Sequence, residues 1–194
     1  MAVAMTVSGC GSGEGESESG SNNDDPSASP TASYFVRADT DAINAAAVKA
    51  QTTGARAQAA KQQAACNKAA DRGYEQWRTC WHKLLDPFRT ALTDLSAQLR
   101  ALAKRDFSED CVTSLEAAGA AFTGFATEVD ELLAGIDSKR RAAQVRALKI
   151  YGATLGEISK SFAEPFQAVT QVCYSPKDLA SIKASPSANP SPSN

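Results

Sequence analysis

The chain has 194 residues, of which 43% are hydrophobic, and a formal net charge of −2. This length suits one domain of ordinary size, and the near-neutral charge argues against a nucleic-acid binder, which would carry a concentrated basic face. Residues 11–33 contain five acids and no base, whereas all 20 Lys and Arg residues follow them, so the rest of the chain is mildly basic. No apolar run approaches the length that a transmembrane helix needs.

Residues 7–10 read Val-Ser-Gly-Cys and follow a short apolar stretch. This segment resembles the lipobox of bacterial lipoproteins, in which an apolar and two small residues (here Val7, Ser8 and Gly9) precede the lipidated cysteine. The resemblance implies a lipid on Cys10 that anchors the chain to the outer, extracytoplasmic face of the cytoplasmic membrane. Residues 1–9 are then the remnant of a signal peptide, and because no base precedes Cys10 we expect the true start to lie upstream.

Two segments that flank the domain have the composition of disordered chain. Residues 10–35, after the lipidated cysteine, are rich in Gly, Ser and acid, and predict a disordered tether. Residues 184–194 predict a disordered Ser/Pro tail. The folded domain is expected at residues 36–183. The alanine-rich domain with its Ser/Pro tail is similar in style to secreted lipoproteins of high-GC Gram-positive bacteria, a likeness that implies no activity.

Apolar residues recur every three or four positions along residues 74–102, 111–136 and 145–173, which predicts three amphipathic helices. The alanine-rich residues 40–71 predict a further helix that buries little area and is the least strongly held. Ser108 is the expected N-cap of the third helix. The small residues of the first helix are expected to face inward, at Ile43, Ala47, Ala50, Gly54, Ala57, Ala60 and Ala64.

Short connections, with turns near Gly73, Asp106 and Ile136, predict an all-α fold: an antiparallel, up-down-up-down four-helix bundle. Pro87 and Pro165 interrupt the apolar pattern and predict kinks in two of the helices. New helix starts at Asp86 or Glu164 are the alternative.

The odd number of five cysteines needs an explanation in a protein outside the cytoplasm, because cysteines there usually pair. A lipid on Cys10 leaves four cysteines, which can form two disulfides. Cys66 and Cys80 lie equally far from the expected turn at Gly73, so an antiparallel hairpin brings them level. Cys111 begins the third helix and Cys173 ends the fourth, so these two ends also meet. The favoured pairing is Cys66–Cys80 with Cys111–Cys173. Buried free thiols are the alternative.

The sequence lacks the residues of the usual cofactor sites. His82 is the sole histidine, and Met1 and Met5 are the sole methionines, so an axial His/Met pair for haem cannot form in the domain. Glu-x-x-His pairs for di-iron are missing, and zinc would need the cysteines that the disulfides use. We expect no cofactor, no metal and no enzyme activity, with His82 a surface residue.

The predicted topology gathers basic and aromatic residues at the end of the bundle away from the tether. The candidate partner-binding residues are Arg72, Trp77, Arg78, Trp81, Lys139, Arg140 and Arg141. Bases beside aromatics suit an anionic partner, such as an anionic wall polymer or an envelope protein. The favoured alternative is that both tryptophans belong to the core. A non-catalytic binding module of the cell envelope is the main hypothesis, beside a purely structural envelope protein or an accessory subunit of an envelope enzyme.

Overall fold

The computed structural model describes residues 33–184, which form an all-helical domain. Its helices are α1 (Arg37–Gln58), α2 (Ala60–Ala69), the short 3₁₀ helix η1 (Ala70–Arg72), α3 (Tyr74–Leu102), α4 (Glu109–Asp137), α5 (Arg141–Ser161), α6 (Glu164–Cys173) and α7 (Pro176–Ala184). No strand occurs within this range, where β-type pairing is limited to one isolated bridge between Ser33 and Phe107. The predicted all-α class is confirmed. The predictions for the lipobox, for Cys10 and for most of the tether and tail lie outside the described residues.

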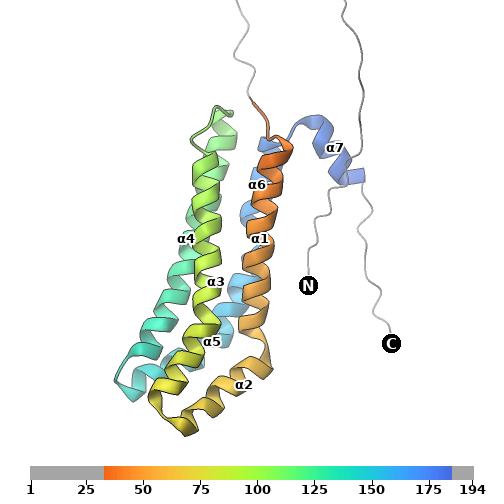
Figure 1. Ribbon diagram of the computed structural model, residues 1–194. Coiled ribbons are helices and arrows are strands. Elements are labelled where there is room, and N and C mark those ends of the chain that lie inside the picture. Colours follow the sequence, from red (N-terminus) through yellow and green to blue (C-terminus); the bar gives the residue numbers. More distant parts are fainter. Residues whose placement is uncertain (1–32, 185–194) are drawn as a thin grey trace, which may run out of the picture.

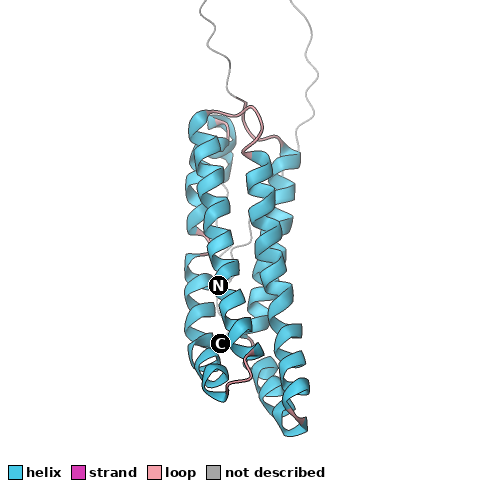
Figure 2. Cartoon of the chain, turned by 90° about the vertical axis from the view of Figure 1, so that its left-hand side faces the viewer, coloured by secondary structure: helices cyan, strands magenta, loops and turns pink. Residues whose placement is uncertain are grey.

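The long helix α3 occupies the centre of the packing. It lies along both α4 and α1, and α2 also packs on it, whereas α5 and α6 pack on α4. Figure 1 shows the other helices running broadly along the long axis of the domain, with α2 oblique at one end and α7 turned away beyond the end of α6, and Figure 2 shows the elongated domain from the side. The connections fall at Gly73, at residues 103–108 and at residues 138–140, where the sequence predicts turns.

The core is built from the apolar stripes that the sequence predicts. Leucine, phenylalanine and isoleucine side chains of α3, α4 and α5 carry most of it, each worth roughly 1.5–3 kcal/mol when fully buried. The largest fully buried side chains are Trp81, Leu85, Leu92, Leu95, Leu99, Leu115, Phe122, Val129, Leu132, Ile136, Leu155 and Ile158. Ser108 caps α4 as predicted, because its Oγ accepts a hydrogen bond from the backbone N–H of Cys111 at 3.3 Å.

The helix α1 packs on α3 through small residues. Ala46, Ala50, Gly54 and Ala57 are buried there, and a Cβ added at Gly54 would stand 2.8 Å from Cε2 of Phe88. Close approach of the two helices therefore needs a glycine at this position. As the sequence predicts, this face buries little apolar area compared with the leucine-rich faces of α3 and α4.

The predicted single helix over residues 40–71 is wrong, because the chain breaks at Ala59 between α1 and α2. Ala59 is extended, with ψ 116°. Carbonyls at the end of α1 that lack an intrahelical partner accept hydrogen bonds from side chains instead. The Tyr151 hydroxyl donates to the carbonyl of Ala57 at 2.7 Å, and Gln63 Nε2 donates to the carbonyl of Gln58 at 3.0 Å.

The break changes the direction of α2 and so changes which residues face inward. Ala60 and Ala64, predicted on the inward face, are exposed, whereas Cys66 and Ala69 are buried.

The two prolines have different effects. Pro87 lies inside α3, which continues through it from Tyr74 to Leu102. At Pro165 the alternative of a new helix holds, because α5 ends at Ser161 and α6 starts at Glu164 with the proline in its first turn. A proline at the start of a helix loses no hydrogen bond, since the first N–H groups have no intrahelical partner.

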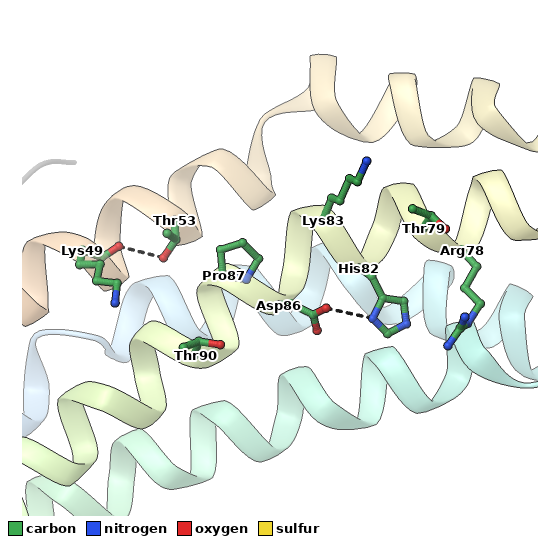
Figure 3. Close-up of a pocket in the computed structure, with 9 residues that line it drawn as sticks. All are labelled: Lys49, Thr53, Arg78, Thr79, His82, Lys83, Asp86, Pro87 and Thr90. Carbon is green, nitrogen blue, oxygen red and sulfur yellow. Dashed lines mark hydrogen bonds and ion pairs between the residues drawn. The ribbon is translucent and has the colours of Figure 1, made fainter.

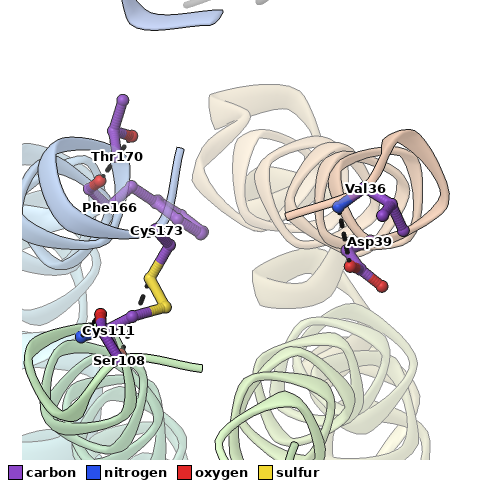
Figure 4. Close-up of a disulfide and its surroundings, with 7 residues drawn as sticks. All are labelled: Val36, Asp39, Ser108, Cys111, Phe166, Thr170 and Cys173. Atoms are coloured by element: carbon purple, nitrogen blue, oxygen red, sulfur yellow. Dashed lines mark hydrogen bonds between the residues drawn. A yellow bond between two sulfur atoms is a disulfide. The ribbon is translucent and has the colours of Figure 1, made fainter. Parts of the chain in front are cut away.

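Both disulfides form in the favoured pairing. Cys66 bonds to Cys80 and Cys111 bonds to Cys173, with Cα–Cα distances of 5.2 and 5.0 Å. The second bridge joins the start of α4 to the end of α6, as Figure 4 shows. It lies in the core, where both of its cysteines are fully buried.

The ordered domain begins before the predicted boundary at residue 36. Phe35 is buried against Phe107 and Tyr174, with ring centroids 5.4 Å apart in both pairs. Its backbone N–H donates to the carbonyl of Cys173 at 2.9 Å. Assigning residue 35 to a disordered tether was therefore wrong, since one aromatic ring at the end of a polar segment suffices to dock it. The helix α7, which extends to Ala184, was not predicted either.

Candidate functional site

Two connections meet at the end of the domain opposite to the start of α1. The Tyr74 hydroxyl, in the first turn of α3, donates to the carbonyls of Ile136 and Asp137 at the end of α4, at 3.2 and 3.0 Å. The turn at Gly73, with φ +113°, and the connection at residues 138–140 therefore lie together. Arg72 and the bases that follow α4 are therefore at the same end of the domain.

Four of the predicted partner-binding residues are exposed and lie on or beside these two connections. We call them the basic end: Arg72, Lys139, Arg140 and Arg141. Within residues 33–184, none of these four cations forms an ion pair. Their charges are therefore exposed and are not paired within the part of the chain that the structure describes.

Trp77 and Trp81 do not belong to this surface. Trp77 is 7% exposed and Trp81 is 2% exposed, and the ring of Trp81 meets that of Tyr151 edge-on with centroids 4.9 Å apart. The favoured alternative, that both tryptophans are core residues, therefore describes the structure, and their assignment as partner-binding residues was wrong. An inward apolar stripe and a binding aromatic share the same helical spacing, so only the packing distinguishes them.

Arg78 forms ion pairs within the domain. Its Nε donates to Oδ1 of Asp137 at 2.5 Å, which links α3 to the last residue of α4, and its guanidinium lies 3.8 Å from Glu75. Arg78 therefore holds two helices together and offers little charge to a partner.

His82, expected as an ordinary surface residue, lies between two carboxylates. Its Nδ1 is 3.1 Å from Oδ2 of Asp86, one turn further along α3, and its Nε2 is 2.8 Å from Oδ1 of Asp137 on α4. Figure 3 shows the ring beside Asp86, with Arg78 close by. The spacing of His82 and Asp86 by four residues is a signal that the sequence contains, whereas the contact with Asp137 depends on the packing of α3 on α4.

The electrostatics of this cluster favour the imidazolium form of His82. Partial burial lowers the pKa of His82, but the hydrogen bonds with Asp137 and Asp86 outweigh it, and the pKa is raised from 6.5. Burial likewise raises the pKa of Asp137, but the hydrogen bonds from His82 and Arg78 outweigh it, and this pKa is lowered. Carboxylates only accept hydrogen bonds, so a ring between two of them donates to both only when it is protonated.

The cluster borders an open groove of about 660 Å³ between α1 and α3. Figure 3 shows its lining, which comes from Lys49, Thr53, Arg78, Thr79, His82, Lys83, Asp86, Pro87 and Thr90. Lys49 is paired with Asp94 at 2.8 Å, so Lys83 is the lining base without an ion pair inside the described range.

This arrangement does not assemble a nucleophile and a base. Both ring nitrogens of His82 face carboxylates, so neither is placed to take a proton from a neighbouring hydroxyl. Among residues 33–184, no group of three or more His, Cys, Asp or Glu side chains could hold a metal ion.

Comparison with known proteins gives this chain no family. A scan of protein-family models, a search of curated proteins and a search of solved structures each returned no match. None of the helices between residues 33 and 184 combines the length and the apolar character that crossing a bilayer requires.

Proposed function

We propose that this protein is a lipid-anchored, extracytoplasmic and non-catalytic binding module of the bacterial cell envelope. The Val7-Ser8-Gly9-Cys10 segment supports the anchor, and the two disulfides support an oxidising compartment. The domain is an antiparallel, up-down-up-down four-helix bundle in which α1 with α2, and α5 with α6, each act as one broken helix. The packing of α3 between α1 and α4 supports this arrangement.

The observation that carries the proposal is the position of the basic end. The tether meets the domain at Phe35, which packs beside Phe107 at the start of α4. The basic end lies at the opposite end of α3, whose 29 residues span roughly 43 Å at the helical rise per residue. A lipid on Cys10 would therefore attach the membrane at one end of the domain and leave these four cations, which form no ion pair within residues 33–184, at the other end.

This geometry favours an anionic partner beyond the membrane surface. The cations lie a helix length away from the point where the tether attaches, so we assign the basic end to an anionic polymer of the cell wall rather than to headgroups of the anchoring bilayer. Exposed cations act on such a partner mainly through long-range attraction, which salt screens.

Binding of poly(glycerol phosphate), measured by calorimetry with the full mature chain, tests the proposal. We expect binding at low ionic strength that weakens as salt is added, and about tenfold weaker binding by the variant Arg140→Glu/Arg141→Glu. The matched control Lys104→Glu/Lys177→Glu makes the same charge change at two exposed bases near the tether end and should bind like the unmodified chain. Equal losses in the two variants, or no binding by the unmodified chain, would contradict the proposal.

A further inference from the structure

A second, smaller groove lies between α1 and α6, in the half of the domain that the tether enters. Aromatic and aliphatic side chains form most of its walls, among them Phe35, Ile43 and Val48 on one side and Phe162, Phe166 and Tyr174 on the other. Polar groups come from the amides of Asn44 and Gln51 and from the Thr170 hydroxyl, and no charged side chain lines it.

The groove exists because its two walls pack on different partners. The helix α1 lies along α3, whereas α6 lies along α4 and is held there by the Cys111–Cys173 bridge. The rings of Phe162 and Phe166, which line the groove, meet the ring of Phe122 on α4 edge-on and tilted, with centroids 5.1 Å apart in both pairs. Figure 4 shows Phe166 and Thr170 on α6, across from Val36 and Asp39 at the start of α1.

Its size and lining define the chemistry of an occupant. The groove has a volume of about 80 Å³, which is room for roughly five to eight water-sized groups. That space is too small for a docked helix and fits a short length of one aliphatic chain. Val48, which is 58% exposed on the groove wall, would lose contact with water when the groove is filled.

We propose that this groove binds one aliphatic chain of a membrane lipid. The source of the chain rests on the proposed lipid anchor, because the segment that links Cys10 to Ser33 joins the domain beside the groove. The residues flanking Phe35 also suit a bilayer surface: Tyr34 is 45% exposed and Val36 is 54% exposed.

Calorimetric titration of the Cys10→Ser chain with 1-octanol, and with 1,8-octanediol as the polar control, tests the groove without the anchor. We expect saturable binding of 1-octanol and much weaker binding of the diol. Ala47→Leu, which fills the groove, should bind 1-octanol about tenfold more weakly or worse. Ala45→Leu adds the same side chain at an exposed position outside the lining and should leave the affinity unchanged.

A second pair of variants tests the groove even if Ala47→Leu does not fold. Val48→Asn makes the groove wall polar and should weaken binding, whereas Val145→Asn changes a residue of matching exposure, 56%, on α5 and should not. Absence of 1-octanol binding, or equal affinities within either pair, would overturn the groove as an aliphatic site. This result is independent of whether Cys10 carries a lipid, so failure of the anchor and failure of the groove are distinguishable.

The source of the chain is tested with the lipidated protein in phosphatidylglycerol vesicles that contain a lipid with a photoreactive diazirine in its acyl chain. After irradiation, mass spectrometry should find label on peptides of α1 and α6 that line the groove, and less of it in Ala47→Leu. Label confined to other peptides would contradict a membrane lipid as the occupant.

Discussion

The Cys111–Cys173 disulfide closes the longer of the two covalent loops, and its removal should be the more damaging. Its cysteines are 62 residues apart in the sequence, against 14 for Cys66–Cys80. The entropy that a cross-link removes from the unfolded chain grows with the logarithm of the loop length. For these separations it corresponds to about 4.3 and about 3.0 kcal/mol at 25 °C. Loss of the longer loop should therefore cost about 1.3 kcal/mol more.

The comparison uses Cys111→Ala/Cys173→Ala and Cys66→Ala/Cys80→Ala, because alanine avoids placing unpaired hydroxyls in the core. Urea denaturation followed by far-ultraviolet circular dichroism gives the free energy of unfolding of each variant and of the oxidised parent. Both variants should be destabilised, the first more than the second. Equal losses, or a greater loss without Cys66–Cys80, would refute the loop-entropy reasoning.

The stability of the domain should fall as pH rises through neutrality. The raised pKa of His82 means that its stabilisation is complete below the ordinary value of 6.5 and is lost as pH passes the raised value. Urea midpoints measured from about pH 5 to about 9 test this. If the midpoint of His82→Gln falls with rising pH as steeply as that of the parent, the pH dependence belongs to another group. Pro87→Ala should stabilise α3 by roughly 1–3 kcal/mol, because it restores a backbone hydrogen bond in mid-helix and the proline is exposed. A lower urea midpoint would contradict that expectation. Gly54→Ala should destabilise by about 1–3 kcal/mol, because its Cβ would stand 2.8 Å from a ring carbon of Phe88. An unchanged midpoint would count against the close packing of α1 on α3.

Most of the features that the sequence predicts correctly depend on local spacing, whereas the pairing of Cys111 with Cys173, 62 residues apart, follows from the antiparallel order of the helices. Ser108 caps α4 because a short polar side chain at that position reaches an N–H three residues on. The pairing of Cys66 with Cys80 follows from their equal distance from Gly73, which is a property of one hairpin. The exposure of the bases at the basic end could be predicted from the polar connections that carry them, whereas the meeting of these two connections depends on contacts between distant segments.

The features that the sequence misses depend on contacts between distant segments. The break at Ala59 is stabilised by the hydroxyl of Tyr151, a hydrogen bond that spans 94 residues. His82 meets Asp137 across 55 residues, so its place between two carboxylates emerges only when α3 packs on α4. Trp77 fits both an inward stripe and a binding surface by its spacing, and packing against the core decides between them.

The proposal of an anchored envelope protein is tested most directly by mass spectrometry of the protein isolated from the cells that make it. We expect the chain in the membrane fraction, beginning at Cys10 with acyl chains attached, and with all four remaining cysteines in the linkages Cys66–Cys80 and Cys111–Cys173. An unacylated chain in the soluble fraction, with thiols that react with alkylating reagents, would contradict the proposal.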